Sequence, residues 1–283
     1  MQAFPRTTVG GRSLSRMIIG TNWFLGWSHQ TPARDAAIKE KFSDRKAIVE
    51  ILEVFLEAGI DTIMGPLAQN PISLEAIQDA EDKTGQGMIR VDTPIMNVAD
   101  TESARDECRE LLDLVKDGRA DFCLPHHSSV EQLVDKGLQT IRRLDTYTDM
   151  IRERDMIPGL SAHMPEIVTY ADAMDADVET YIQIYNSLGF LMQIEVDWVA
   201  KIIQDAKKPV MTIKPMAAGR IPPFQAFPFV WNTIREQDMV TVGTMARREA
   251  QECIEYSLAC LERRPPNLSV RSTPSKQKAS QHS

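Results

Sequence analysis

Short apolar runs alternate with amphipathic stretches along most of this chain. The apolar runs end in glycine, proline or polar residues, a pattern that predicts buried strands. They lie at residues 17–20, 60–66, 87–97, 120–127, 156–164, 179–186, 208–220 and 238–245. Each run is followed by a segment with the apolar spacing of a one-sided helix. These helices are expected at 45–59, 73–83, 104–116, 130–154, 165–174, 195–206, 224–235 and 246–261.

The regular alternation of strands and helices predicts the fold class. Strands separated by helices pair in parallel, and eight such pairs in 283 residues favour a closed barrel over an open sheet. No GxGxxG motif follows the first strand, which argues against a Rossmann fold. We therefore predict an α/β protein with one (β/α)8 TIM-barrel domain at 1–262. The segment 263–283 is polar and nearly free of apolar residues, so we expect a disordered tail.

Composition narrows the class of partners. The net charge is −8 and the pI is near 5.3, and no basic cluster lies in the body of the chain, so nucleic acid is not an expected partner. No apolar run approaches the roughly 20 residues that span a bilayer, and the N-terminus lacks a signal-peptide core. The four scattered cysteines form no CxxC pair and are read as reduced thiols. These features favour a cytoplasmic enzyme with a small-molecule substrate, and they are compatible with a homo-oligomer.

Polar and titratable residues recur where the predicted strands end. The carboxyl ends of the strands carry the chemistry in TIM barrels, so these residues form one candidate active-site face. The residues that we expect to contact substrate there are Asn22, Trp23, His29, His127, Gln183 and Asn186.

His126 and His163 follow neighbouring strands and are expected to lie close together. With Asp92 they would form a site for a divalent metal such as zinc, manganese or iron. They would equally serve as an acid/base pair, because histidine titrates near neutral pH. A third interpretation is that one or both only bind carbonyl groups at the barrel rim. No HxH or HExxH spacing decides between these interpretations.

Basic residues follow the last two predicted strands. Lys214 is interpreted as an electrostatic anchor for an anion or a developing oxyanion, with a Schiff base as the alternative. Loops after the seventh and eighth strands often hold phosphate in these barrels, which makes Arg220, Thr244 and Arg247 candidate cofactor contacts. The alternative is that both arginines are simply solvated.

Several motifs resemble those of the aldo-keto reductase superfamily. GRSLSRMIIGT is similar to the opening hairpin and first strand of that family, ADFCLPHH to its fourth strand, GLSAH to its fifth, and VGTMARREAQECI to its eighth strand and cofactor-binding helix. The resemblance covers about residues 10–261. It implies a barrel with a short N-terminal hairpin, an NADP cofactor, and the family's catalytic histidine at His126.

The other catalytic positions of that family differ here. Its aspartate would fall near Met64, its lysine near Pro94, and its tyrosine has no counterpart in residues 65–71. We therefore expect a barrel enzyme that acts on a small oxygen-rich, sugar-like or phosphorylated substrate. It would use histidine-centred acid/base or metal-assisted chemistry, as an isomerase, lyase or hydrolase. One alternative is an NADP-dependent reductase of the aldo-keto reductase type, and another is a non-catalytic barrel that binds a ligand or partner.

Overall fold

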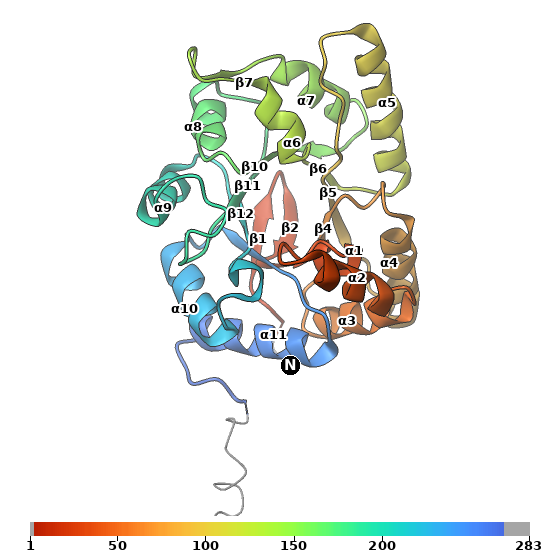
Figure 1. Cartoon of the computed structure of the whole chain (residues 1–283), viewed down its shortest axis with the longest axis vertical. Coiled ribbons are helices and arrows are strands. Elements are labelled where there is room, and N and C mark those ends of the chain that lie inside the picture. The colour runs from red at the N-terminus through yellow and green to blue at the C-terminus, as the bar shows by residue number, and fades with distance from the viewer. Residues whose placement is uncertain (1–2, 269–283) are drawn as a thin grey trace, which may run out of the picture.

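The computed structural model describes residues 3–268 and contains a parallel barrel with helices around it (Figure 1). The barrel strands are buried on both faces because they consist mainly of branched and other large apolar residues. In chain order they are β3 (Met17–Gly20), β4 (Thr62–Gly65), β5 (Ile89–Asp92), β6 (Phe122–Cys123), β9 (Ile157–Pro158) with β10 (Leu160–Ala162), β11 (Tyr181–Ile184), β12 (Val210–Ile213) and β13 (Met239–Val242).

The barrel closes through a strand that is interrupted at Gly159. The segment β9 pairs with β6 and the segment β10 pairs with β11, so one strand links both ends of the sheet order. A Cβ atom at position 159 would lie 2.7 Å from Cγ of Leu124 and 2.8 Å from the carbonyl oxygen of Thr180. Glycine is therefore required where the neighbouring strands approach this backbone. The predicted TIM barrel is confirmed.

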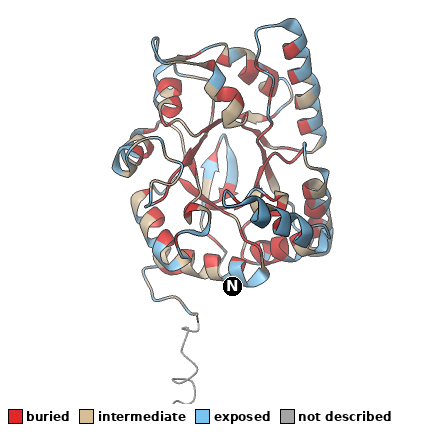
Figure 2. Ribbon diagram, in the orientation of Figure 1, coloured by how far each residue is buried: buried red, intermediate tan, exposed pale blue. Residues whose placement is uncertain are grey.

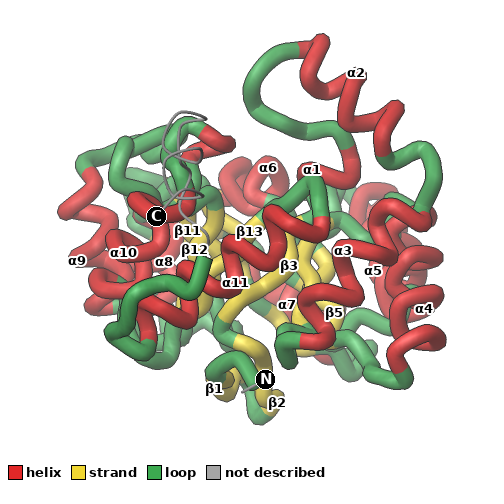
Figure 3. Tube along the Cα trace, turned by 90° about the horizontal axis from the view of Figure 1, so that it is seen from below, coloured by secondary structure: helices red, strands yellow, loops and turns green. Residues whose placement is uncertain are grey.

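The helices lie around the strands (Figure 3), and they carry buried residues on one side and exposed residues on the other (Figure 2). In α3 (Lys46–Glu57) the buried side chains include Ile48, Ile51 and Phe55, which are the positions that set its helical spacing. The other large helices are α4 (Pro71–Thr84), α5 (Glu102–Asp117), α7 (Leu144–Arg152), α8 (Glu166–Ala173), α9 (Val196–Asp205), α10 (Pro223–Thr233) and α11 (Arg247–Leu261).

A hairpin closes the end of the barrel where the strands begin (Figure 3). It consists of β1 (Arg6–Val9) and β2 (Arg12–Ser15), paired antiparallel. Val9 and Leu14 are buried and pack in the same apolar cluster as Ile18 and Phe122 of the barrel interior. The hairpin expected from the family resemblance is confirmed, and ligand access is left to the opposite end.

Two segments differ in detail from their expected structure. The long first loop contains α1 (Asn22–Leu25) and α2 (Pro32–Lys41). The helix expected at 130–154 is wrong over its first half. That region forms α6 (His127–Val130), a 3-10 turn η1 (Glu131–Leu133) and a small hairpin of β7 (Val134–Asp135) and β8 (Thr140–Ile141) before α7 begins. The Asp135 carboxylate accepts the Leu138 N–H at 3.0 Å, which stabilises the hairpin turn instead of a helix.

Of the expected tail at 263–283, residues 269–283 lie outside the described residues, and 263–268 form no helix or strand. None of the helices within residues 3–268 combines the length and the apolar character that a membrane span requires.

Candidate functional site

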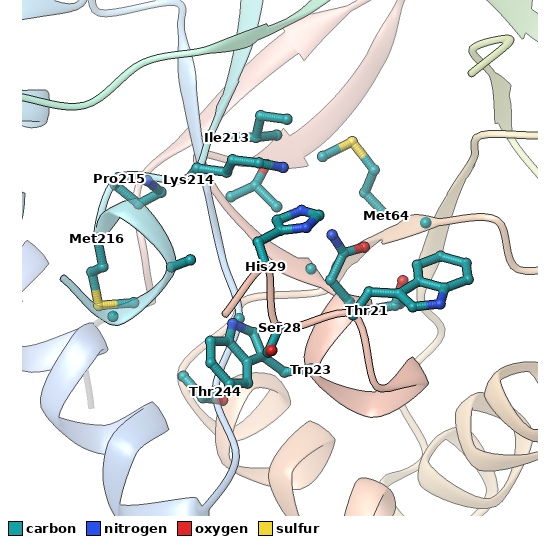
Figure 4. Close-up of a pocket in the computed structure, with 18 of the residues that line it drawn as sticks. Thr21, Trp23, Ser28, His29, Met64, Ile213, Lys214, Pro215, Met216 and Thr244 are labelled. Atoms are coloured by element: carbon teal, nitrogen blue, oxygen red, sulfur yellow. The ribbon is translucent and has the colours of Figure 1, made fainter. Parts of the chain in front are cut away.

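A cavity of about 760 Å³ lies at the carboxyl ends of the strands, opposite the hairpin (Figure 4). Every strand of the barrel contributes to its wall, either directly or through the residues that follow it. The contributing residues, in strand order, are Thr21, Met64, Thr93, His126, Ser161 with His163, Ile182, Lys214 and Thr244. The first loop and the loops after β12 and β13 complete the wall. This is the position at which ligands bind in barrels of this type.

The cavity brings together eight of the site residues expected from the sequence. They are Asn22, Trp23, His29, His126, His127, His163, Lys214 and Thr244. Five other expected residues do not line it, namely Asp92, Gln183, Asn186, Arg220 and Arg247.

Asp92 does not line the cavity and is buried at 1% exposure. One carboxylate oxygen accepts the Ala68 N–H at 2.8 Å, while Oδ1 has no hydrogen-bond partner among the described residues. Burial raises the pKa of Asp92 to about 7, although backbone N–H groups act against that rise. Because Asp92 does not line the cavity, it does not join His126 and His163 there as expected from the sequence.

Gln183 and Asn186, which were both expected to contact substrate, point elsewhere. Gln183 lies in β11, and Asn186 lies in the loop that follows it. Gln183 is fully buried, and its Oε1 has no partner among the described residues. Asn186 instead holds the loop after β11: its side chain donates to the Phe190 carbonyl at 3.0 Å and accepts the Phe190 N–H at 2.9 Å.

The two predicted cofactor-binding arginines are engaged with protein groups. The guanidinium of Arg220 lies 4.0 Å from the ring centroid of Phe190 and donates to the carbonyl of Ala217 at 3.1 Å. Arg247 lies 3.4 Å from a Glu53 carboxylate oxygen. Both arginines would have to exchange these contacts to bind a phosphate.

Three imidazole rings pack against one another on one wall. The His127 and His163 rings stack with centroids 3.6 Å apart, and the His126 ring lies 4.1 Å from that of His127. Burial, followed by the charge of His127, lowers the pKa of His126 to about 4 and that of His163 to about 3. His126 and His163 are therefore neutral at pH 7.

The tautomer of His126 follows from its neighbours. Its Nδ1 accepts the Ser128 N–H at 3.3 Å and lies 2.7 Å from the Ser128 hydroxyl oxygen. Because Nδ1 accepts a hydrogen bond, the ring proton is assigned to Nε2. His126 can therefore donate from Nε2.

Lys214 extends across the cavity near His29 (Figure 4). It makes no ion pair with any described carboxylate, and burial lowers its pKa to about 8. Its backbone φ is +60°, and Ala217 and Ala218 in the same loop also have positive φ values. Residues with side chains rarely adopt this conformation, and such strain is often found at ligand-binding loops. The small residues of this loop let the chain turn tightly around the cavity.

Several functional groups were missed by the sequence interpretation. Arg34 lines the cavity 6.0 Å from the Trp23 ring centroid and makes no ion pair with a described carboxylate. The hydroxyls of Thr21 and Thr241 are buried and have no hydrogen-bond partner within residues 3–268. Glu131 lies one helical turn after His127, and that spacing was a signal the sequence did contain.

Comparisons with known proteins were made in sequence and in structure. No protein-family model matches this chain, and no curated protein matches it in sequence. A presumed aldo-keto reductase of Pseudomonas aeruginosa shares the fold with a TM-score of 0.65 and 16% identity, covering 92% of this chain and 98% of that one.

Two further similar structures are aldo-keto reductases with a bound nicotinamide cofactor. One from Klebsiella pneumoniae, in complex with NADP and acetate, has a TM-score of 0.55 at 15% identity and covers 96% of this chain and 99% of that one. Another, complexed with NADPH, has a TM-score of 0.57 at 12% identity and covers 96% and 91%.

These comparisons correct the functional prediction. The expectation of an isomerase, lyase or hydrolase is wrong, because the similar structures are mostly aldo-keto reductases and favour the reductase alternative. That expectation rested on the absence of the family's tyrosine and lysine from their usual positions, whereas the similar structures share the architecture of nearly the whole chain. This chain has the fold of a divergent aldo-keto reductase.

Proposed function

We propose that this protein is an oxidoreductase that binds NADP(H) at the barrel mouth and reduces the carbonyl group of a small molecule. The observation that carries the proposal is a set of cavity-lining hydroxyls, on Thr21, Thr241 and Thr244, that are buried and have no hydrogen-bond partner among the described residues. Leaving such a group unpaired costs about 1–3 kcal/mol, so a polar ligand would regain that energy. The nicotinamide complexes of similarly folded proteins support this ligand class.

The chain offers groups that fit such a cofactor. Ser161 of β10 lines the cavity, where its hydroxyl suits the carboxamide of a nicotinamide. Arg34 is a cavity-lining cation without a carboxylate partner among the described residues, and it suits phosphate oxygens. When bound, a reduced nicotinamide supplies a hydride to a carbonyl carbon.

Two residues of the chain would then act on the carbonyl oxygen. Lys214 is protonated at pH 7, because its pKa of about 8 is above that value, and it would stabilise the developing negative charge. His126 would orient the oxygen through its Nε2–H, since Ser128 occupies Nδ1. Lys214 is the proton source that we propose in place of a tyrosine, because the imidazole pKa values are too low for a charged acid at neutral pH.

The cytoplasmic location and the homo-oligomer stay predictions. Four free cysteines support a reducing compartment.

The test is a fluorescence titration of the purified untagged protein with NADPH and with NADH, followed by turnover with a panel of small aldehydes and ketones. We expect saturable NADPH binding that weakens at least about tenfold in Arg34→Ala, the size of a lost charged hydrogen bond. Arg12→Ala is the matched control, because Arg12 lies on the closing hairpin and pairs with Asp121. Absence of saturable binding would contradict the proposal, and binding without turnover would contradict its oxidoreductase part.

A further inference from the structure

A compact group of three potential metal ligands lies beside the cavity, and two of them, His127 and His163, line its wall. His127, Glu131 and His163 each present a ligand atom, and these atoms lie within 4.8 Å of one another. His127 and Glu131 are four residues apart on consecutive turns of α6 and η1, while His163 directly follows β10. The i and i+4 positions of a helical segment share one face, so both side chains point to the same side. We propose that these three residues bind a divalent transition-metal ion.

The carboxylate is held in place by the segment that carries the second histidine. Glu131 Oε1 accepts the backbone N–H groups of His163 at 2.8 Å and of Met164 at 3.0 Å. The other oxygen, Oε2, lies 3.6 Å from Nδ1 of His127. Because backbone bonds occupy Oε1, Oε2 is left to bind an ion. The arrangement is preorganised, since the same two bonds fix His163 relative to α6.

One ring nitrogen of His127 lacks a hydrogen-bond partner among the described residues. Its Nδ1 is buried and has no hydrogen-bond partner among the described residues, because 3.6 Å to Glu131 exceeds hydrogen-bond distance. Buried polar atoms of this kind call for an explanation such as an ion or an ordered water. A cation between Nδ1 and Oε2 would satisfy both atoms.

The stacked rings would have to tilt to share one ion. The planes of His127 and His163 are only 16° apart, so their nitrogen lone pairs run nearly parallel. Rotation about χ2 of histidine has broad minima, so a moderate tilt is inexpensive. Two imidazoles and one carboxylate are a donor set of zinc enzymes and of non-haem iron sites. His127 and His163 also line the cavity, which leaves a coordination position open to a ligand.

This group is distinct from the metal set expected from the sequence. His126 uses Nδ1 on Ser128, and Asp92 does not line the cavity. Glu131 and His127 take their places. The proposal does not depend on NADP(H), so either can fail alone.

The experiment titrates chelator-treated, untagged full-length protein with Co²⁺, followed by visible absorption, and with Zn²⁺, followed by calorimetry. We expect one equivalent of each ion to bind, with an affinity that falls at least about tenfold in Glu131→Gln and in His163→Ala. Glutamine keeps an oxygen for the two backbone N–H groups and removes the charge, so Glu131→Gln should fold. Circular dichroism and NADPH titration of each variant confirm that the cavity is intact.

His126→Ala is the matched control, a histidine of the same wall outside the proposed ligand set, and it should bind Co²⁺ as the unmodified protein does. The proposal is overturned if neither ion binds stoichiometrically. It is equally overturned if Glu131→Gln binds Co²⁺ normally, or if His126→Ala is the variant that loses the ion.

Discussion

The indole ring of Trp23 packs directly on Gly243 at the end of the last barrel strand. A Cβ atom at position 243 would lie 2.1 Å from Cδ1 of Trp23, so a side chain there would overlap the ring. Trp23 belongs to α1 in the first loop, whereas Gly243 follows β13. This contact therefore fixes the first loop over the cavity. Arg34, 6.0 Å from the centroid of the same ring, is positioned by it.

Substitution of Gly243 by alanine should displace Trp23 and disturb the cavity. We expect NADPH affinity to fall about tenfold and stability to fall by about 1–3 kcal/mol, the usual cost of overpacking. Fluorescence titration and urea unfolding measure the two effects. Gly87→Ala is the control, because no atom lies within 4 Å of its Cβ position. Equal behaviour of the two variants would show that Trp23 does not depend on Gly243.

A double variant tests whether the effect of Gly243→Ala comes from its contact with the Trp23 ring. In Trp23→Leu the smaller side chain leaves room, so Gly243→Ala should cost much less in that background. The difference is the coupling energy of the pair, which we expect to exceed about 0.5 kcal/mol. Additive unfolding energies would contradict a direct steric contact.

Asp92 should make stability depend on pH in the direction opposite to a salt-bridged carboxylate. Its pKa is raised from 3.8 to about 7 by burial, so the folded protein holds the proton more tightly than the unfolded chain. Its contribution to stability is fully present below about pH 4 and is lost as the pH rises through about 7. Asp92→Asn, which keeps an acceptor for the Ala68 N–H, should remove this loss.

The measurement is the free energy of unfolding of both proteins in urea across that pH range. The variant should match the unmodified protein at the acid end and exceed it above neutral pH by on the order of 3 kcal/mol. Parallel stability curves for the two proteins would show that Asp92 titrates normally.

Gly159 is expected to be essential for closure of the barrel. Its Cβ position overlaps Leu124 and the Thr180 backbone, and the backbone atom cannot move aside. Gly159→Ala should therefore lower stability by about 1–3 kcal/mol, with the melting temperature as the measurement. A melting temperature like that of Gly87→Ala would mean that β9 and β10 adjust freely.

The sequence predicted the barrel because each strand and helix carries a local signal. Ile48, Ile51 and Phe55 keep the helical period and are buried, as that period requires. The helix prediction for the segment after His127 failed because the apolar residues there also suit a helix. The turn at Asp135 that replaces the helix depends on one side-chain hydrogen bond.

The site was harder to predict than the fold. Strand ends were found because the barrel places all of them on one face, and eight expected residues line the cavity. Arg34 was missed because it lies outside a strand end and reaches the cavity only through tertiary packing. Glu131 was missed although its spacing from His127 was visible, because its contact with the His163 segment is also tertiary. Asp92 was expected in the cavity because it lies at a strand end. Its carboxylate instead accepts the Ala68 N–H, and the residue does not line the cavity.

Lys214 should give turnover a characteristic pH dependence. Burial lowers its pKa from 10.5 to about 8, so its charge is present below that value and is lost as the pH rises through it. The proton that Lys214 would donate to the carbonyl oxygen is therefore available below about pH 8. Turnover of the carbonyl substrate should fall by at least roughly tenfold between about pH 6.5 and 9.5 as the ammonium loses that proton.

Lys214→Met tests this assignment because it keeps the apolar stem and removes the charge. The variant should turn over the carbonyl substrate about as slowly at every pH as the unmodified protein does at high pH, which a steady-state assay measures directly. Its NADPH affinity, measured by fluorescence titration, should change much less, since the ammonium is the proposed proton source. Persistence of the pH dependence in Lys214→Met would assign the titration to another group, and unchanged turnover would remove Lys214 from the chemistry.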